Sequence, residues 1–231
     1  MYQKVIKRAL DFLLSLLALL LLSPLLLLLT LVGAVTMKGN PFFVQRRPGK
    51  QGKDGRERII RIIKFRTMTN KRDADGRLLP DNMRLNKYGR MLRATSLDEL
   101  PELLNILVGD MSIVGPRPQL VRDMTFMTAE QRRRHSVLPG LTGLAQVNGR
   151  NNISWEQKFE YDLQYIDQGI TFARDVKIVL RTVGQVLKRN DTVREGTVSD
   201  LDFGDWLMQE GKVTREEYDQ KQNEAKELLE V

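Results

Sequence analysis

The chain is organised around the stretch SLDELPELLNILVGDMSIVGPRP, residues 96–118. Two adjacent carboxylates, Asp98 and Glu99, open an apolar run with helical spacing, which ends at Gly109. The segment Met-Ser-Ile-Val at 111–114 is typical of a short strand. We therefore expect a short helix with an acidic start, followed by a strand.

The acidic start of this helix has several interpretations. Ser96 and Glu99 have the spacing of a capping box, in which both side chains satisfy free backbone amides. Pro101 then falls past the first turn, where it is costly, whereas a helix start at Asp98 removes the conflict. With either start the carboxylates lie at the positive end of the helix dipole, which favours ionisation. An ionised Asp98 can cap, ligate a metal or act as a nucleophile.

The turn after the strand holds one arginine between two prolines, at Gly115-Pro116-Arg117-Pro118. Each proline restricts the preceding residue to extended geometry, so the direction of Arg117 is fixed at little entropic cost. This arrangement suits an anion site, although a plain surface turn explains the same residues.

These motifs closely resemble the bacterial sugar transferase family, the monotopic polyprenol-phosphate phosphoglycosyl transferases. The resemblance runs from Met1 to about Gly196 and includes KFRTM at 64–68 and PGLTGLAQVNGR at 139–150. It implies transfer of a sugar 1-phosphate from a nucleotide sugar, expected to be a UDP sugar, to polyprenyl (undecaprenyl) phosphate. It also implies release of UMP, a phosphosugar-aspartyl intermediate, and a first membrane step of bacterial glycoconjugate and polysaccharide assembly.

The resemblance also implies roles for individual residues. Catalysis and Mg²⁺ binding are implied for Asp98 and Glu99, and Glu99 is open as a metal ligand or as a base. Contacts to the substrate phosphates are implied for Lys64, Arg117, Arg150 and Asp162. Contacts to lipid or membrane are implied for Ser23, Pro24, Pro116 and Pro118.

The composition bounds the class of protein. A chain of 231 residues allows one domain with an appendage, and the absence of cysteine excludes disulfides and zinc–thiolate sites. The net charge of +8 is uneven, because residues 195–231 carry 4 Lys and Arg against 11 Asp and Glu. The basic body suits an anionic membrane face or phosphorylated substrates. No basic–aromatic interleaving is present, so we expect no nucleic-acid partner.

One membrane segment is evident. From Phe12 to Met37 the chain is almost wholly apolar, long enough to cross roughly 30 Å of hydrocarbon. An ordinary spanning helix is one interpretation, but Pro24 removes a helix hydrogen bond and the Ser23 hydroxyl can satisfy the freed carbonyl. Basic residues on both flanks favour two cytoplasmic ends. A helix that breaks at Ser23-Pro24 and re-enters one leaflet meets that demand. The resemblance implies the same topology, monotopic on the cytoplasmic face of the bacterial inner membrane.

The remaining chain predicts an α+β fold with short strands. Residues 42–45 and 59–66 look like the two strands of a hairpin, with Lys64 at its far end. A lysine there is a solvated strand residue or, as the resemblance favours, a phosphate contact. The glycine-rich stretch 138–150 should be strand and turn. Its amides can approach a phosphate, and Arg150 can hold one by a bidentate fork.

Two amphipathic helices are expected at 155–166 and 172–187, with Asp162 off the apolar side of the first. Core packing is the default for both apolar faces, and lying in the headgroup plane as interfacial helices is the alternative. The only histidine, His135, sits in a basic run and is expected at the surface.

We divide the chain into a re-entrant helix (1–38), a catalytic domain (39–196) and an acidic helical tail (197–231). Thr214 and Glu217 predict a capping box in the tail, which weakly resembles SHOCT helical modules; a disordered tail is the alternative. Two other function classes stay open, a lipid-binding membrane adaptor and a polyprenyl diphosphate phosphatase. A homo-oligomer is compatible with the sequence.

Overall fold

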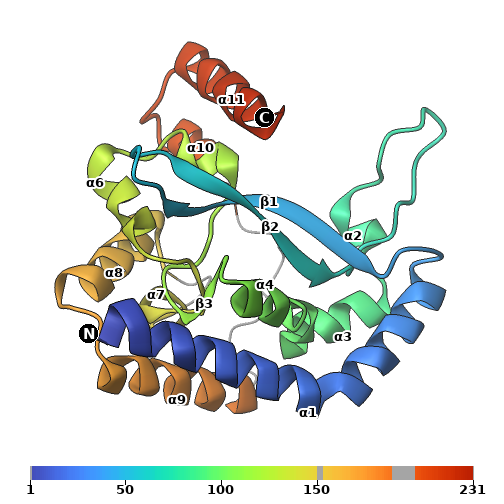
Figure 1. Cartoon of the computed structure of the whole chain (residues 1–231). Helices are drawn as coiled ribbons and strands as arrows, with labels where there is room; N and C mark the ends of the chain where they lie inside the picture. Colours follow the sequence, from blue (N-terminus) through green and yellow to red (C-terminus); the bar gives the residue numbers. More distant parts are fainter. Residues whose placement is uncertain (1, 150–152, 189–200, 231) are drawn as a thin grey trace.

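The computed structural model describes residues 2–149, 153–188 and 201–230. A π-helical turn η1 (Tyr2–Ile6) leads into the long helix α1 (Lys7–Thr36), which runs along one side of the molecule beside α9 (Phe172–Lys188) (Figure 1). Helix α4 (Glu102–Val108) lies between α1 and the hairpin of β1 (Phe42–Gln51) and β2 (Glu57–Phe65). The mixed helix and sheet class predicted from the sequence is confirmed.

The hairpin is antiparallel, with Arg47 opposite Ile60 and Phe43 opposite Lys64. Because side chains alternate along a strand, Ile60, Ile62 and Lys64 share one face. The two isoleucines are buried in the core under α4, and Lys64 continues the same face at the rim of that core. A second pair of strands, β3 (Ser112–Val114) and β4 (Gly140–Thr142), is parallel. The predicted hairpin and both short strands are therefore confirmed, but Leu144–Val147, expected as strand and turn, forms a helix.

Helix α4 is held by side-chain hydrogen bonds to both of its neighbours, β2 and α1. The Asn105 side chain accepts from the backbone N–H of Ile63 at 3.1 Å and donates to the carbonyl of Arg61 at 2.7 Å, so it pins α4 to the edge of β2. Gly109 ends the helix with φ 94°, a left-handed conformation that favours glycine. Arg8 of α1 donates to the last carbonyls of α4, including Leu107 at 2.7 Å, where a cation is favourable.

The acidic start of α4 differs from both predicted versions. Ser96 has a left-handed backbone (φ 56°) and makes no side-chain cap, so the predicted capping box with Glu99 is wrong. Residues Leu97–Glu99 form a 3₁₀ turn, η2, and the α-helix begins only at Glu102. Pro101 directly precedes the helix, because it has no N–H to continue the turn before it. The two carboxylates thus lie ahead of the helix rather than inside its first turn.

The turn η2 is held by α3 (Lys87–Thr95), which packs tightly against the chain after β2. A Cβ on Gly89 would lie 1.9 Å from the carbonyl oxygen of Thr67, so only glycine allows this approach. Since Ser96 reverses the chain directly after α3, the position of Asp98 depends on this contact.

Helix α1 contains 30 residues and continues through Pro24, so the predicted break does not interrupt the helix, although Figure 1 shows a bend in its second half. Pro24 leaves the carbonyl of Leu20 without its usual donor, and the Ser23 hydroxyl donates to that carbonyl at 2.8 Å, as predicted. Segment 2–36 is long and apolar enough to cross a membrane by length and composition. Large exposed apolar side chains line it: Leu13, Leu14, Leu17, Leu20, Leu21, Leu27, Leu28, Leu31 and Val35.

Both halves of α1 are bound to the rest of the protein. Near its start, Asp11 is buried and accepts from the backbone N–H of Ile113 at 3.0 Å. Near its end, the Tyr88 hydroxyl donates to the carbonyl of Leu29 at 2.7 Å. The helix is therefore an integral part of the folded domain.

Helix α9 joins α1 at its N-terminus, where Lys7 pairs with Asp175 at 2.6 Å. The sequence predicts that the apolar face of α9 packs in the core. Ile178 is buried, but Phe172, Leu180 and Val183 are at least half exposed. Core packing is therefore wrong for much of this face, and the exposed side chains extend the apolar surface of α1.

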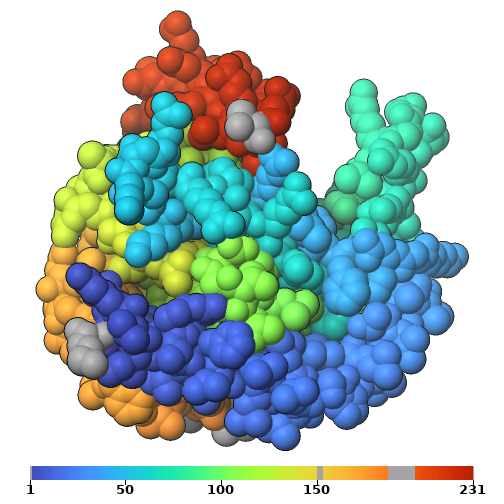
Figure 2. Space-filling view, in the orientation of Figure 1, coloured from blue at the N-terminus to red at the C-terminus, as the bar shows by residue number. Residues whose placement is uncertain are grey.

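Short helices and a longer one complete the part of the chain before the tail. They are α2 (Asp81–Arg84), α5 (Val121–Met124), α6 (Ala129–Arg132), the 3₁₀ turn η3 (Arg133–Ser136), α7 (Leu144–Val147) and α8 (Trp155–Asp167). Figure 2 shows the segment before α2 projecting from the body.

His135 in η3 is buried, so its predicted surface position is wrong. Its Nδ1 lies 3.1 Å from Oε1 of Glu57, and Glu57 also pairs with Arg132. Burial lowers the pKa of His135, which keeps the ring neutral beside the carboxylate.

The tail forms α10 (Phe203–Gln209) and α11 (Arg215–Glu230), and the disordered alternative is wrong. The predicted capping box is present, because Glu217 N–H donates to the Thr214 hydroxyl at 3.2 Å and Thr214 N–H donates to the Glu217 carboxylate at 2.8 Å. Phe203 is buried against Trp155 and Phe159, and both helices lie at the opposite end of the molecule from α1 (Figures 1 and 2). The proposed boundary at 196/197 lies outside the described residues.

Candidate active site

Asp98 lies in η2 with a half-buried side chain. Among the residues that the structure describes, none donates a hydrogen bond to its carboxylate. Burial and the charge of Glu99 raise the pKa of Asp98 to about 6, although three nearby cations act in the opposite direction: Lys64, Arg117 and Arg93. Asp98 is therefore ionised at neutral pH and has both carboxylate oxygens available.

Glu99 is in the opposite situation, because two cations bind it. Lys64 Nζ lies 2.9 Å from Oε1 of Glu99, and Arg117 donates to both carboxylate oxygens. Burial alone would raise the pKa of Glu99, but the charges and hydrogen bonds of Arg117 and Lys64 outweigh it and hold that pKa well below its usual range. In return Glu99 raises the pKa of Arg117, so both members stay charged.

A third carboxylate joins the cluster. Glu102, the first residue of α4, has a side chain only 3% exposed and lies 3.0 Å from Lys64 Nζ. Burial raises its pKa, against the effect of the lysine. Lys64 thus links the hairpin to the start of α4, with one ammonium group between two carboxylates.

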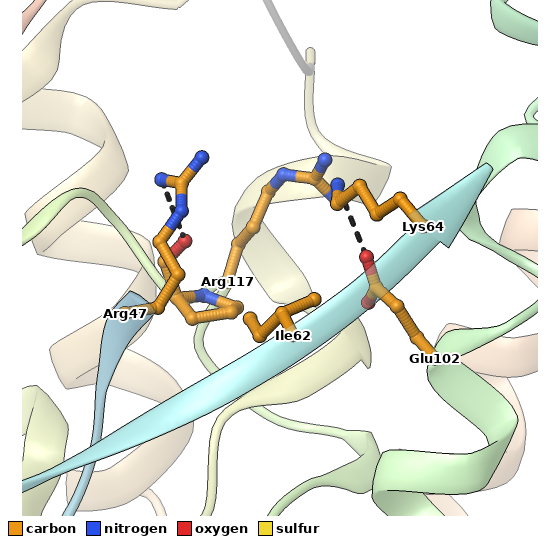
Figure 3. A pocket seen from close by; sticks show the side chains of 6 residues that line it. Arg47, Ile62, Lys64, Glu102 and Arg117 are labelled. Carbon is orange, nitrogen blue, oxygen red and sulfur yellow. Dashed lines mark hydrogen bonds and ion pairs between the residues drawn. The ribbon is translucent and has the colours of Figure 1, made fainter. Parts of the chain in front are cut away.

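A small polar pocket opens over this cluster and is lined by Arg47, Ile62, Lys64, Glu102, Arg117 and Pro118. Figure 3 shows Lys64 reaching from β2 toward the head of Arg117, and Arg47 on the other side of Arg117. Three cationic side chains from different parts of the sequence therefore converge on one opening. Such a set of donors is suited to a phosphorylated ligand.

The structure brings together four of the residues predicted from the sequence: Asp98, Glu99, Lys64 and Arg117. Ser23 lies apart from them, exposed on α1 next to Pro24. Of the two prolines assigned to lipid contacts, Pro118 lines the pocket and Pro116 is buried. Arg150 lies outside the described residues.

Asp162 is not brought into this pocket. It is buried in α8, where it pairs with the equally buried Arg134 at 2.6 Å. Arg134 also donates to the backbone carbonyl of Arg117 at 2.6 Å. Asp162 therefore reaches the site only through the arginine that holds the backbone of the Arg117 turn.

Three residues of the site were missed from the sequence. Arg47 was taken only as part of the basic flank of the membrane segment, and Glu102 and Asn105 only as part of the motif at 96–118. The sequence alone does not show whether the side chain of an arginine in a strand faces lipid or a pocket. The register of the hairpin, which places Arg47 opposite Ile60 of the core face, is the signal that identifies it.

Comparison with known proteins identifies the family of this chain. The sequence model of the family described as "Bacterial sugar transferase" matches residues 2–189, which include every residue of the cluster. This chain belongs to the bacterial sugar transferase family. The tail helices α10 and α11 lie beyond the matched range.

Individual relatives of this sugar transferase support the assignment. It is 52% identical over 163 residues to "Uncharacterized sugar transferase EpsL" of Bacillus subtilis, covering 70% of this chain and 78% of that one. It is 40% identical over 191 residues to the UDP-glucose:undecaprenyl-phosphate glucose-1-phosphate transferase of Caulobacter vibrioides, covering 78% and 69%. The Klebsiella pneumoniae protein of the same name is 40% identical over 189 residues, but only 39% of its length is covered.

This sugar transferase is therefore an enzyme, and its cluster has the features that such chemistry needs. Within the described residues the Asp98 carboxylate accepts no hydrogen bond, and the cations Lys64 and Arg117 lie near it. Asn105 and Arg8 hold α4 in place, and Gly89 allows the close packing of α3. The membrane helix contributes directly, because Arg8 binds the far end of α4.

Proposed function

We propose that this protein transfers a sugar 1-phosphate from a UDP sugar to undecaprenyl phosphate and releases UMP, with Asp98 as the nucleophile. The observation that carries the proposal is the contrast between the two neighbouring carboxylates. Asp98 has no hydrogen bond within the described residues, whereas Glu99 is held by two cations. The names of relatives from Caulobacter vibrioides and Klebsiella pneumoniae support the substrate class.

The reaction has two steps. An oxygen of Asp98 bonds to the β-phosphorus, the bond from that phosphorus to the bridging oxygen breaks, and the electron pair leaves with UMP. An oxygen of the lipid phosphate then bonds to the same phosphorus, the acyl-phosphate bond breaks, and the carboxylate of Asp98 is regenerated. An aspartyl phosphate is reactive enough for a weak phosphate nucleophile to discharge it, so one difficult step becomes two easier ones.

The cations offset the charge of this attack of one anion on another. Lys64 and Arg117 are already oriented by Glu99, so little reorganisation is needed when the diphosphate binds. Glu99 is a poor general base, because a base works best with a pKa near the working pH and the pKa of Glu99 is held far below it. We therefore assign Glu99 to orienting the cations and to metal binding.

Magnesium is part of the proposal. Among the described residues no group of three acidic or histidine side chains could hold a metal ion, but Mg²⁺ is commonly bound by one or two carboxylates with substrate phosphates. Asp98 and Glu99 fit that role, since Oε2 of Glu99 accepts a hydrogen bond from Arg117 at 3.2 Å and keeps a second lone pair. When bound, the ion would offset charge on the diphosphate. We expect EDTA to abolish turnover and added Mg²⁺ to restore it; unchanged turnover in EDTA would remove the metal.

The pH dependence of the first step should report Asp98. Its pKa of about 6 lies above the usual value of 3.8, so the fraction of ionised Asp98 falls about tenfold per pH unit below 6. The rate at which labelled UMP exchanges into the UDP sugar should fall in parallel and level off above about pH 7. Protonation of Asp98 favours the folded state in the same range, so this loss is not caused by unfolding at Asp98. A flat exchange rate from pH 7 to 5 would contradict the assignment.

A monotopic arrangement on the cytoplasmic face of the bacterial inner membrane is also proposed. What supports it is that both halves of α1 bind the same folded domain, through Asp11 near its start and the carbonyl of Leu29 near its end. A helix bound along its length to one folded domain favours an arrangement with both ends on the same side of the bilayer. The exposed apolar side chains of α1 and α9 give the surface that would enter one leaflet.

Cysteine labelling tests this topology, because the natural chain has no cysteine. Lys4→Cys and Lys38→Cys flank the helix. We expect neither to react with a membrane-impermeant maleimide in intact cells, and both to react in inverted vesicles. Labelling of Lys4→Cys in intact cells would require a spanning helix and would overturn the re-entrant proposal.

The proposed activity is tested with the full chain in detergent or nanodiscs. Undecaprenyl phosphate is supplied with UDP-glucose and with a panel of other UDP sugars, and the lipid product and UMP are both measured. A transferase makes lipid-linked sugar and UMP in equal amounts. Release of inorganic phosphate from undecaprenyl diphosphate would favour a phosphatase, and the absence of any product would favour a membrane adaptor.

A further inference from the structure

Arg47 lines the pocket but has no role in the two reaction steps proposed above. It lies opposite Ile60 on the hairpin, so it shares the face that carries Ile62 and Lys64. Lys64 is four residues along β2 from Ile60, and both long side chains nevertheless reach the same opening (Figure 3). Arg117 stands between them in this view.

The three cations of the pocket differ in their partners. Lys64 and Arg117 are each paired with Glu99, whereas Arg47 forms no ion pair within the described part of the chain. Its hydrogen bonds go to neutral acceptors, to Oε1 of Gln45 from Nε at 3.1 Å and from Nη2 at 2.7 Å, and to the Pro118 carbonyl from Nη1 at 3.3 Å. A guanidinium has five N–H groups, so two of them remain for a ligand.

The surroundings of Arg47 make this lack of a partner costly. Burial, together with the charge of Arg117, lowers its pKa to about 10, and the carboxylates of Asp123, Glu102 and Asp202 offset this only in part and without a hydrogen bond to it. A partly buried charge without an ion pair is destabilising, and such groups concentrate at functional sites where a ligand supplies the counter-charge. An anion that enters the pocket would give Arg47 the ion-pair partner that the described residues do not supply.

The position of that anion follows from the direction of the reaction. Phosphoryl transfer places the attacking and leaving oxygens roughly in line, so the leaving group lies on the side of the β-phosphorus away from Asp98. Lys64 pairs with Glu99, the neighbour of Asp98, and Figure 3 shows Arg47 on the opposite side of Arg117 from Lys64. Arg47 is thus the lining cation on the far side of the array.

We propose that Arg47 binds the phosphate monoester that stands in line with Asp98, first UMP as it leaves and then the lipid phosphate as it arrives. The inference rests on the proposed function. UMP and undecaprenyl phosphate share one chemical group, a phosphate monoester dianion, and both must lie opposite Asp98 in their own half of the reaction. One arginine fork can serve both, because it contacts the phosphate oxygens and not the rest of either molecule.

The first arm of the test measures UMP binding to the full-length protein by calorimetry, with uridine as the comparison. Arg47→Ala should weaken UMP binding at least tenfold and leave uridine binding unchanged. Arg47→Lys keeps the charge but loses the fork, so it should recover only part of the affinity. Arg61→Ala removes the same charge from an exposed position on the neighbouring strand and should bind UMP as the wild type does.

The second arm follows discharge of the labelled enzyme by undecaprenyl phosphate after the free UDP sugar has been removed. Discharge should slow at least tenfold in Arg47→Ala, and UMP should compete with undecaprenyl phosphate in the wild type. Unchanged UMP binding in Arg47→Ala overturns the proposal. Weaker UMP binding with unchanged discharge overturns the shared site. If the wild type itself forms no labelled enzyme, the proposed function fails whatever Arg47 does.

Discussion

Asp98→Asn is expected to abolish sugar-phosphate transfer while the fold survives. The amide cannot form an acyl phosphate, so activity should fall by on the order of 10⁴-fold or more. The substitution should not lower the melting temperature, because the carboxylate makes no hydrogen bond within the described residues and burial disfavours its charge. Steady-state turnover and a thermal unfolding curve on the same sample check both parts.

Asp110→Asn is the matched control, because it makes the same chemical change at the other end of α4. Asp110 pairs with the exposed Arg58 at 3.4 Å, outside the cluster, so this variant should keep wild-type turnover. Substantial activity in Asp98→Asn, with Asp110→Asn also active, would show that Asp98 is not the nucleophile.

The second large effect is expected at the cations that flank Glu99. Lys64→Ala and Arg117→Ala should each reduce kcat/KM by about 10²-fold or more, since each removes charge-assisted contacts to the phosphates. Arg58→Ala removes an exposed cation and should have little effect. Comparable losses in all three variants would mean that general charge, and not this cluster, carries the activity.

Loss of Lys64 also leaves Glu102 buried without its cation, so instability could imitate a catalytic defect. The double variant Lys64→Met with Glu102→Gln removes both charges and should restore the melting temperature of the wild type. Its turnover should stay as low as that of Lys64→Ala. Recovery of turnover together with stability would assign Lys64 a purely structural role.

Much of the local structure follows from patterns in the sequence. Two apolar runs predicted the hairpin, helical periodicity predicted α8 and α9, and the Thr214 capping box predicted the start of α11. Even the bond from Ser23 to the carbonyl freed by Pro24 could be predicted, because it involves neighbouring residues. These features depend on contacts within a few positions along the chain.

The errors concern residues whose partners are distant in the sequence. His135 looked like a surface residue in a basic run, but Glu57, 78 positions away, neutralises its surroundings and allows burial. Asp162 looked available to a ligand, but Arg134 binds it from another element. The helix start was misplaced because Ser96 takes a left-handed backbone that propensity does not favour for serine.

The site itself was predictable only in part. The motif resemblance placed Asp98, Glu99, Lys64 and Arg117 in one site, and the structure brings these four together. The resemblance did not assign separate roles to Asp98 and Glu99. That assignment comes from the pairing of Glu99 with two cations, a contact set built by β2 and the Arg117 turn.

The covalent phosphosugar–Asp98 intermediate can be detected by mass spectrometry. The full-length protein is incubated with a labelled UDP sugar that supports turnover, without undecaprenyl phosphate, and digested for mass spectrometry. A phosphosugar is expected on the peptide that contains Asp98, absent in Asp98→Asn and discharged when undecaprenyl phosphate is added. Turnover that needs both substrates together, with no labelled peptide and no exchange of UMP, would contradict the covalent intermediate and leave Asp98 as a metal ligand.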